Sequence, residues 1–522
     1  MASPAFPVMI GIDNPIQLRA NIGKQIQNVW NQRAWATAAT ALLIVCVFGW
    51  LAFEIPKGIL SGTDELLTAE RTREMLLTEP WVVHFNFHRS FEKPPLQYWL
   101  TTLTLPRFAN RTLAVRVWPL LYGMLTVIAL VWLTHLVQPS RPWLMPLSVA
   151  VLASCPLFSP EASRALLDIG LTFFTTMTIV FAQLARRRPV WWLAAATMCW
   201  LGSLQKLPFP FLVWLLIVMV RLTSRAERPT LQNGWLIASM LLAVIAMAIW
   251  PAIQFVMYRM PVASLFHEEV VVWTGPTELG ARPYFHVLIG LSTAGGLCGL
   301  LGLLAPFTIL SSKKEKATPA VREIAIVSLA VIGLVIVSNF RDVRYILPII
   351  PCLCFLLALV LHRFLEQGGK IRRCAAAALV VLLAAGFVQA KIKIWSNVSS
   401  SRISVSFVPA KVRIDRRQKD VADEKRIAEE LGALQRAGTQ TVLIKAIKPG
   451  GDLLWDSFYL FHGNFRFPVA KYTVDEVRSN PPKSPLIGAC VTRDFPVVQE
   501  IYPNVRVQLT RSQFVCWRAD TP

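Results

Sequence analysis

Ionisable side chains are concentrated in one stretch of an otherwise apolar chain, from Ser61 to Trp99. Acids and bases alternate there with aromatic residues, as in the run from Phe91 to Pro95. Its main charged members are Asp64, Glu65, Glu70, Arg71, Arg73, Glu74, His84, His88, Arg89, Glu92 and Lys93. Ionisable groups set among aromatics at a bilayer surface indicate chemistry at that interface. We therefore predict an active-site loop within residues 54–112.

Other ionisable residues lie far along the chain, at the ends of apolar segments. They are Glu161, Arg164, Asp168, Lys206, His267, Glu268, Glu269, Arg341, Asp342 and Arg344, the last followed by Tyr345. Carboxylates supply a base for an acceptor hydroxyl, and cations hold a phosphate as it accumulates charge. These residue types predict group transfer from a lipid phosphate. The sequence has no Walker-type or Gly-x-Gly-x-x-Gly loop and so gives no sign of a nucleotide, which fits a carrier-lipid donor.

The elements that must position these groups are membrane helices. The 522-residue chain has a mean hydropathy of +0.48, with 54% hydrophobic and 16% charged residues, which excludes an ordinary soluble enzyme. We predict a mainly α-helical transmembrane bundle of about eleven spans, each near the length that crosses the hydrocarbon. The predicted spans are 35–53, 113–136, 143–159, 165–184, 190–204, 207–220, 235–257, 284–310, 324–338, 345–361 and 374–390.

The distribution of Lys and Arg predicts the orientation of the chain. Basic clusters at 186–188, 221–228, 313–316 and 363–373 alternate with loops that are poorer in these residues. The positive-inside rule places the basic clusters in the cytoplasm, and with them residues 1–34, which carry no signal-peptide cleavage pattern. Loop 54–112 and everything after residue 390 then face the periplasm. The net charge of +22 is explained by topology and not by nucleic-acid binding.

Residues 391–522 have the composition of a small soluble α/β domain on the outer face. Helical spacing extends from Asp420 to Arg436, and β-branched or aromatic runs at 441–446, 486–492, 505–510 and 513–517 are typical of strands. Cys490 and Cys516 lie in two of these runs. In an oxidising compartment they could pair, and the sequence leaves the pairing open.

The order of these pieces resembles the GT-C membrane glycosyltransferases, in the branch of the lipid A aminoarabinose transferase and the bacterial relatives of protein O-mannosyltransferases. The matching residues are Asp64-Glu65, Arg73-Glu74-Met75, Phe91-Glu92-Lys93-Pro94-Pro95-Leu96, Asp168, Lys206, His267-Glu268-Glu269 and Arg344-Tyr345. The similarity covers roughly residues 35–361. Where the family often has Asp-Glu-Ala-Arg-Tyr, this chain continues from Asp64-Glu65 with Leu66, Leu67 and Thr68.

The resemblance implies an inverting glycosyltransferase that takes a sugar from a polyprenyl phosphate to an acceptor lipid, protein or envelope glycan in the bacterial inner membrane. It makes Asp64 the general base and Asp168 the second catalytic acid. It implies substrate binding, through the sugar or its phosphate, by Glu65, Lys93, Lys206, Arg344 and Tyr345. Glu92 and His267 resemble positions that bind a divalent metal ion in some relatives, so a metal cofactor is possible but not required.

Each of these residues also has a structural interpretation. Asp64 could cap a helix over 65–77, and Glu65 could be a first-turn charge favoured by the helix dipole. Asp168 could pair with Arg164, the lysines could extend to lipid headgroups, and Tyr345 could belong to an interfacial belt. A transporter or flippase of lipid-linked sugars is the competing function. Transporters place ionisable groups near the bilayer midplane and show repeated halves, whereas here the charges gather at one face and no repeat is visible.

Overall fold

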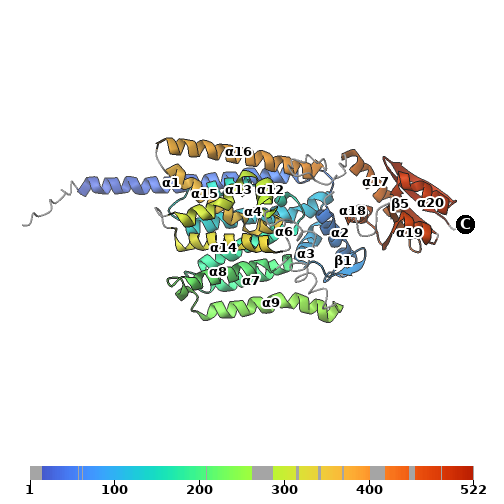
Figure 1. The fold of residues 1–522 in the computed structure, drawn as a ribbon, viewed down its shortest axis with the longest axis horizontal. Helices are drawn as coiled ribbons and strands as arrows, with labels where there is room; N and C mark the ends of the chain where they lie inside the picture. Colours follow the sequence, from blue (N-terminus) through green and yellow to red (C-terminus); the bar gives the residue numbers. More distant parts are fainter. Residues whose placement is uncertain are drawn as a thin grey trace, which may run out of the picture.

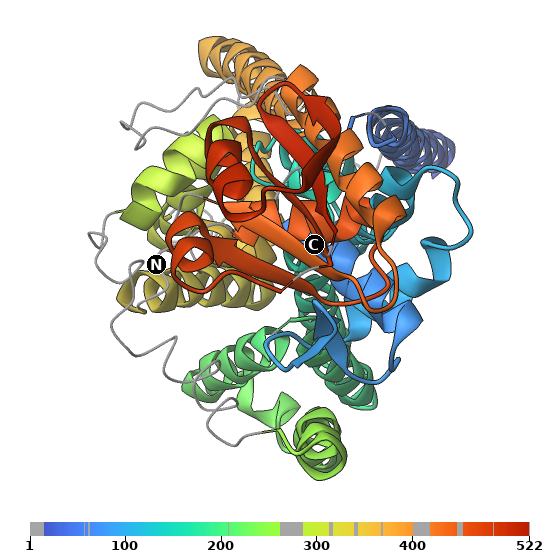
Figure 2. The same ribbon diagram turned by 90° about the vertical axis from the view of Figure 1, so that its right-hand side faces the viewer.

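The computed structural model describes residues 15–56, 58–60, 63–206, 208–260, 286–312, 317–338, 343–366, 369–399, 418–445, 453–483 and 485–520. Figure 1 shows a bundle of roughly parallel helices with a C-terminal sheet domain at one end, and Figure 2 looks onto that domain from outside. The helices of the bundle are α1 (Pro15–Glu54), α4 (Arg111–Val137), α5 (Leu144–Ala153), α6 (Leu167–Leu184), α7 (Trp191–Gln205), α8 (Phe209–Thr223), α9 (Gly234–Tyr258), α12 (His286–Ala294), α13 (Gly296–Ser311), α14 (Pro319–Val337), α15 (Ile350–Glu366) and α16 (Gly369–Ser399).

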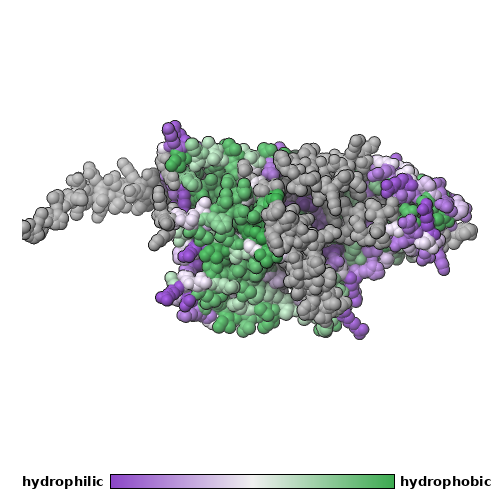
Figure 3. All heavy atoms as spheres, viewed as in Figure 1, coloured by the Kyte–Doolittle hydropathy of each residue, from purple (hydrophilic) through white to green (hydrophobic). Residues whose placement is uncertain are grey.

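Seven of the described helices are long and apolar enough to cross a membrane, and three shorter apolar helices accompany them. The predicted helical transmembrane bundle is confirmed, and each predicted span overlaps at least one described helix, although residues 154–159 of span 143–159 are not helical. One span differs in form, because predicted span 284–310 is broken into α12 and α13 at Gly295, and Gly296 adopts a φ of +60°. Figure 3 shows the apolar surface of the bundle as a band with hydrophilic residues along its left-hand end.

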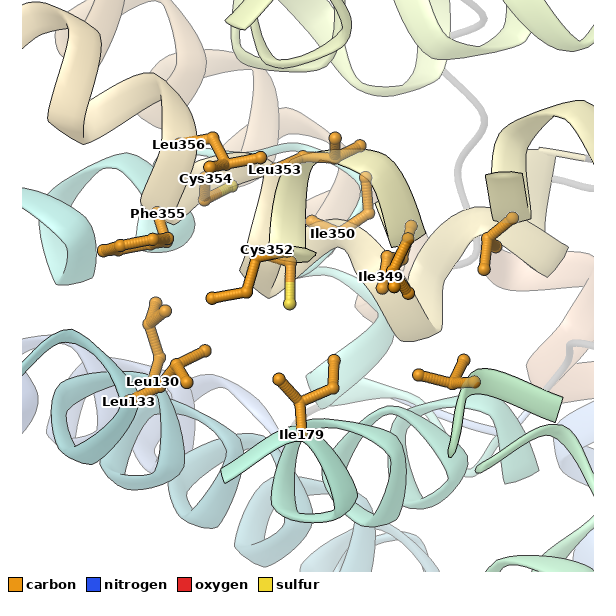
Figure 4. Packing of buried hydrophobic residues seen from close by; sticks show 14 of the residues in the cluster. Leu130, Leu133, Ile179, Ile349, Ile350, Cys352, Leu353, Cys354, Phe355 and Leu356 are labelled. Atoms are coloured by element: carbon orange, nitrogen blue, oxygen red, sulfur yellow. The ribbon is translucent and has the colours of Figure 1, made fainter. Parts of the chain in front are cut away.

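The core of the bundle forms around α6, which packs against α4, α7, α8 and the short 3-10 helix η4 (Val343–Ile349). Figure 4 shows Leu130 and Leu133 of α4 and Ile179 of α6 facing Cys352 and Phe355 of α15. Peripheral helices differ from this centre in that their large apolar side chains are exposed. On α9, large apolar side chains such as Ile237, Leu241 and Val256 are exposed, as expected of a surface solvated by lipid.

The C-terminal sheet domain (Gln418–Asp520) has a five-stranded mixed sheet in the order β4-β3-β5-β7-β6. Strands β3, β4 and β5 are parallel, whereas β7 pairs antiparallel with β5 and β6. The predicted α/β character is confirmed, but β4 and three short helices were not predicted. The elements are α17 (Gln418–Leu434), β3 (Gln440–Lys445), α18 (Leu453–Gly463), β4 (Val469–Thr473), α19 (Val474–Ser479), β5 (Leu486–Val491), α20 (Phe495–Ile501), β6 (Val505–Arg511) and β7 (Phe514–Ala519).

The register of β5 on β7 excludes the pairing of Cys490 with Cys516. Cys516 lies opposite Ala489, and Cys490 lies opposite Val515. Because successive side chains of a strand point to opposite faces, the two thiols lie on opposite sides of the sheet. They belong to different hydrophobic clusters, and both are free.

The segment between α1 and α4, termed the outer loop after its predicted side of the membrane, lies between the bundle and the sheet domain. It contains α2 (Thr63–Leu77), the hairpin of β1 (Val83–Phe85) and β2 (His88–Ser90), and α3 (Leu96–Thr104). Apolar residues of α2 and of α18 share one buried cluster, to which Leu66 and Phe458 belong. At the hairpin turn the Asn86 side chain exchanges two hydrogen bonds of 2.9 Å with the backbone of Val469. The outer loop is therefore held on both sides.

Candidate active site

The first turn of α2 is fixed to the bundle through Glu65. Its carboxylate accepts hydrogen bonds of 2.9 and 3.0 Å from Arg116 of α4 and one of 2.9 Å from the Ala165 N–H. Both charged side chains are almost fully buried. Such a pair holds two elements in register, because removing either partner leaves an uncompensated buried charge. Glu65, predicted to bind substrate, therefore acts in this geometry as the anchor of α2.

Asp64 precedes Glu65 on the helix and points in a different direction. Its Oδ2 accepts a 2.8 Å hydrogen bond from Arg344 of η4, and half of its side-chain surface is exposed. Helix α2 already includes Thr63, so Asp64 lies in the first turn and is not the capping residue. Residues 280 positions apart in the sequence thus meet at the end of the bundle next to the sheet domain, and the carboxylate stays accessible.

Asp168 and Lys206 form a second ion pair beside the first. Asp168 lies in the first turn of α6, and its Oδ1 accepts a 2.6 Å hydrogen bond from the Lys206 ammonium at the end of α7. The charges of Arg344 and Lys93 also act on this carboxylate. The alternative partner of Asp168 is engaged elsewhere, since Arg164 forms an ion pair with Glu161.

An aromatic ring and a cavity complete the arrangement. The Lys206 ammonium lies 5.1 Å from the centre of the Tyr345 ring, a cation–π distance. Lys206 also lines a cavity of about 370 Å³ together with Glu92 and Lys93. Its opposite wall is apolar and comes from α9, with Met247, Ala248, Trp250 and Pro251. The cavity therefore joins a cationic end to the lipid-exposed helix of the bundle.

Glu92 and Lys93 are positioned by α2 and α3. Arg71 donates a hydrogen bond of 2.5 Å to Glu92 and one of 3.4 Å to the hydroxyl of Tyr98. The guanidinium of Arg71 is buried, whereas the Glu92 side chain is 56% exposed. The next residue after Glu92 is Lys93, so this contact holds the lysine at the cavity wall.

The predicted metal ligands are Glu92 and His267. His267 lies outside the described residues, with the neighbouring Glu268 and Glu269. Among the residues that are described, no three His, Cys, Asp or Glu side chains gather in a way that would hold a metal ion. The carboxylate of Glu92 is already bound by Arg71. We therefore assign no chemical step to a metal.

Arg73 and Glu74, which belong to the residues that match the family pattern, are buried against the sheet domain. Arg73 binds Glu70 through hydrogen bonds of 2.8 and 2.7 Å and donates a third, of 2.6 Å, to the Phe465 carbonyl. Burial, followed by repulsion from Glu70, raises the pKa of Glu74 to about 8. The Phe87 N–H donates to the same carboxyl group at 2.8 Å. The clustering of acids and bases between 70 and 74 was the available signal for this contact.

The predicted site residues thus separate into three groups. Asp64, Asp168, Lys206, Arg344 and Tyr345 lie in one connected set, and Lys93 acts on it electrostatically. Glu65 and Glu92 form ion pairs that hold α2 and the residues beside Lys93 in place. Residue 267 is not described. Such a set, with two carboxylates and three cations at the mouth of a partly apolar cavity, suits a reaction in which an anionic group is held while a proton is removed.

Comparison with known proteins relates the chain to membrane glycosyltransferases. Residues 64–260 match the dolichyl-phosphate-mannose-protein mannosyltransferase family. Over 370 residues the chain is 27% identical to an undecaprenyl phosphate-alpha-4-amino-4-deoxy-L-arabinose arabinosyl transferase of Pseudomonas fluorescens. That alignment covers 66% of this chain and 62% of the relative, so less than two thirds of the relative's length is matched.

Two solved structures have a similar fold. ArnT from Cupriavidus metallidurans, bound to undecaprenyl phosphate, superposes with a TM-score of 0.69 at 16% identity, covering 93% of this chain and 98% of that one. The oligosaccharyltransferase of Archaeoglobus fulgidus, solved with Zn and sulfate, superposes with a TM-score of 0.54 at 11% identity, covering 93% and 73%. The resemblance found in the sequence is thereby confirmed: the chain has the GT-C fold and is similar to the aminoarabinose transferases and protein mannosyltransferases among membrane glycosyltransferases.

Proposed function

We propose that this protein is an inverting glycosyltransferase that moves a sugar from a polyprenyl phosphate to an acceptor hydroxyl on a lipid, protein or envelope glycan. The observation that carries the proposal is the meeting of Asp64, Arg344, Asp168 and Lys206 beside a partly apolar cavity. The name of the Pseudomonas relative supports undecaprenyl phosphate as the carrier. Whether the sugar is a pentose or a hexose stays open.

In this mechanism Asp64 is the general base. It accepts the proton of the acceptor hydroxyl while the hydroxyl oxygen bonds to the anomeric carbon. The bond between that carbon and the phosphate oxygen breaks on the opposite face of the sugar, and its electron pair leaves with the polyprenyl phosphate. The half-exposed position of Asp64 gives an acceptor access to the carboxylate.

The cations stabilise the departing phosphate. Lys206 and Lys93 line the cavity, and Arg344 reaches the same region from η4. Asp168 holds the Lys206 ammonium at 2.6 Å and so orients it before the donor arrives. Arg344 is bound to Asp64 in this structure. A donor phosphate that attracts Arg344 would release the carboxylate for proton transfer, so donor binding would activate the base.

The apolar wall of the cavity supports a lipid donor. Met247, Ala248, Trp250 and Pro251 come from α9, whose other apolar side chains are largely exposed. A prenyl chain can therefore follow these apolar side chains from the cavity toward the bilayer. The ionisable groups that line or act on this cavity lie at one end of the bundle and not at its middle, which favours the transferase over a lipid-linked sugar transporter.

The opposite end of the bundle supports the proposed orientation. Arg186 pairs with Glu227 and Glu323, and Arg221 pairs with Glu323, so the basic turns near 186 and 221 meet there. By the positive-inside rule that end is cytoplasmic, which puts the active site and the C-terminal sheet domain in the periplasm of a bacterial inner-membrane protein. A reporter enzyme fused after residue 400 tests this, because activity only in the cytoplasm would reverse the assignment.

The test of the function compares purified wild-type protein with Asp64→Asn. Both receive radiolabelled undecaprenyl-phosphate sugar and a cell-envelope extract. We expect the transfer rate to fall by about 10² to 10⁴, the usual contribution of a general base. Asp456→Asn is the matched control, because it also removes an Asp that pairs with a cation, Lys471, but in the sheet domain. Undiminished transfer by Asp64→Asn would exclude Asp64 as the base.

A further inference from the structure

A second cavity lies between the bundle and the C-terminal sheet domain. It has a volume of about 410 Å³ and belongs to neither the proposed donor site nor the α9 wall. Its lining comes from three places in the chain: the segment before α2, the start of α4, and helices α17 and α18. The lining residues are Gly58, Ile59, Ala109, Asn110, Arg111, Thr112, Lys425, Glu429, Phe461 and His462. We refer to it as the seam cleft.

Arg111 is the unusual member of the seam cleft. Its guanidinium lies 4.2 Å from the centre of the Phe461 ring. Within the described part of the chain it forms neither an ion pair nor a hydrogen bond through its side chain. A guanidinium offers five N–H donors in a planar fork that matches carboxylate and phosphate groups. The donors of this partly buried Arg are therefore available to an anion that enters the cleft.

The charges around Arg111 do not replace such an acceptor. Glu429 lies across the cleft but already pairs with Lys425 at 3.5 Å. Glu70 acts on Arg111 from α2, but it is bound by Arg73, whose charge repels Arg111. The cleft therefore keeps an excess of positive charge.

Backbone and side-chain donors around Arg111 add to this excess. Arg111 is the first residue of α4, a helix of 27 residues with no acidic residue in its first turn. The Asn110 side chain caps Leu113 N–H and leaves the N–H groups of Arg111 and Thr112 directed along the start of the helix. The Lys425 ammonium is 39% exposed on the other wall. The donors thus come from both sides of the cleft.

His462 makes the cleft wall rigid instead of adding charge. Burial lowers the pKa of His462 to about 3, so the imidazole is neutral. Its Nε2–H donates to the Leu60 carbonyl at 3.2 Å, directly before α2. The cleft is therefore bounded by the segment that leads to Asp64, and an occupant would lie on the same outer end of the bundle as the proposed active site.

We propose that the seam cleft binds a phosphate group through Arg111, Lys425 and the start of α4. A membrane lipid headgroup or a soluble phosphate could supply that group, and the experiment separates the two. The proposal does not depend on which residue is the catalytic base. Asp64→Asn is expected to leave phosphate binding unchanged, so failure of the proposed transferase mechanism and failure of this site can be told apart.

The test uses the full chain in detergent without phosphate buffer. Inorganic phosphate is titrated by calorimetry, and lipid A is compared with dephosphorylated lipid A by native mass spectrometry. Arg111→Gln is expected to weaken binding of the phosphorylated probe about tenfold, as for the loss of a charged hydrogen bond. Arg111→Lys keeps the charge and should weaken it less. Lys425→Gln tests the other wall through an exposed residue whose replacement leaves the fold intact.

Arg107→Gln is the matched control. Arg107 is an exposed arginine just before α4 that donates to the Leu103 carbonyl and does not line the cleft. Binding of lipid A but not inorganic phosphate assigns the cleft to a lipid headgroup, and equal binding of both assigns it to phosphate in general. The proposal is overturned if neither probe binds, or if Arg107→Gln weakens binding as much as Arg111→Gln.

Discussion

The two ends of the helical bundle each contain a buried acid paired with cations, and they differ in how completely the acid is satisfied. At the inner end the Glu323 carboxylate accepts four hydrogen bonds, from Gln183, Arg186 and Arg221. At the outer end the Asp168 carboxylate accepts one from the described residues, that of Lys206. The inner cluster is closed, whereas the outer cluster borders a cavity and the accessible Asp64.

This difference distinguishes a structural ion-pair cluster from a candidate active site. A carboxylate whose lone pairs are all occupied by the protein cannot interact with a substrate, and its value lies in joining helices α6, α8 and α14. A carboxylate with one partner, next to cations that line a cavity, keeps its neighbours available for an incoming anion. Charge and burial alone would have ranked the two clusters alike. Completeness of hydrogen bonding distinguishes them.

The largest expected effect is on stability at the inner end. Arg221→Met leaves Glu323 with fewer partners in a dry environment, and we expect the free energy of unfolding to fall by about 3–5 kcal/mol. Thermal unfolding in detergent measures this. The transfer rate per folded molecule should stay near that of the wild type. A variant that is stable but inactive would break the comparison, because the inner cluster would then contribute to the reaction.

The outer cluster, around Asp168 and Lys206, should respond in the opposite way: its loss should lower the transfer rate more than the stability. Lys206→Gln removes a cation from the cavity, and we expect the transfer rate to fall by about 10² to 10³, as when one preorganised transition-state donor is lost. The unfolding free energy should change less than in Arg221→Met, since Arg344 and Lys93 still act on Asp168. Single-turnover transfer and thermal unfolding of the same preparation test both statements. Unaltered transfer would remove Lys206 from the site.

A third cluster, around Glu74, sharpens the comparison, since it lies at the outer end but is buried against the sheet domain. The pKa of Glu74 is raised to about 8 from 4.5, so the folded state binds more protons than the unfolded state between these values. Stability from this group is therefore complete below about pH 4.5 and is lost as the pH rises through 8. Glu74→Gln should abolish that loss. Unfolding curves at pH 5, 7 and 9 test it, with Glu79→Gln, from an exposed ion pair, as control.

The smallest expected effect concerns the hairpin contact. Asn86→Ala removes two hydrogen bonds to Val469, and we expect a loss of about 1–3 kcal/mol in the attachment of the sheet domain. Hydrogen exchange at β4 should rise, while exchange in α6 should not. The exposed Asn504 provides the control Asn504→Ala. Equal exchange in both variants would show that the hairpin does not hold the sheet domain.

The helical bundle could be predicted because apolar runs of this length indicate membrane-spanning helices. The site residues could be predicted because an apolar chain contains few charged residues. The ion-pair partners of those charged residues could not be predicted. Glu65 is bound by Arg116, which lies 51 residues away within predicted span 113–136, and nothing in the sequence links the two. The sequence left the pairing of Cys490 and Cys516 open, and the strand register excludes it, since a shift of one residue reverses the face of a strand.

The sequence also did not predict two local features of the backbone. The glycines at 295 and 296 divide a predicted span into α12 and α13, which hydropathy alone does not reveal. The hairpin at residues 83–90 turns at Asn86 and Phe87, both with positive φ, and Phe87 is an unusual residue at such a position. Contact with the sheet domain fixes this turn. Sequence reasoning saw only a charged loop there.

Helix α2, about 22 Å long for its 15 residues, carries Asp64 near one end, and its buried face is shared with the sheet domain through Arg73 and the Phe458 cluster. A graft of the C-terminal domain from a relative would therefore replace half of the surroundings of this helix. Chimeras that transplant residues 63–90 together with the domain should keep the carboxylate aligned, whereas transplanting the domain alone should tilt it away from the donor.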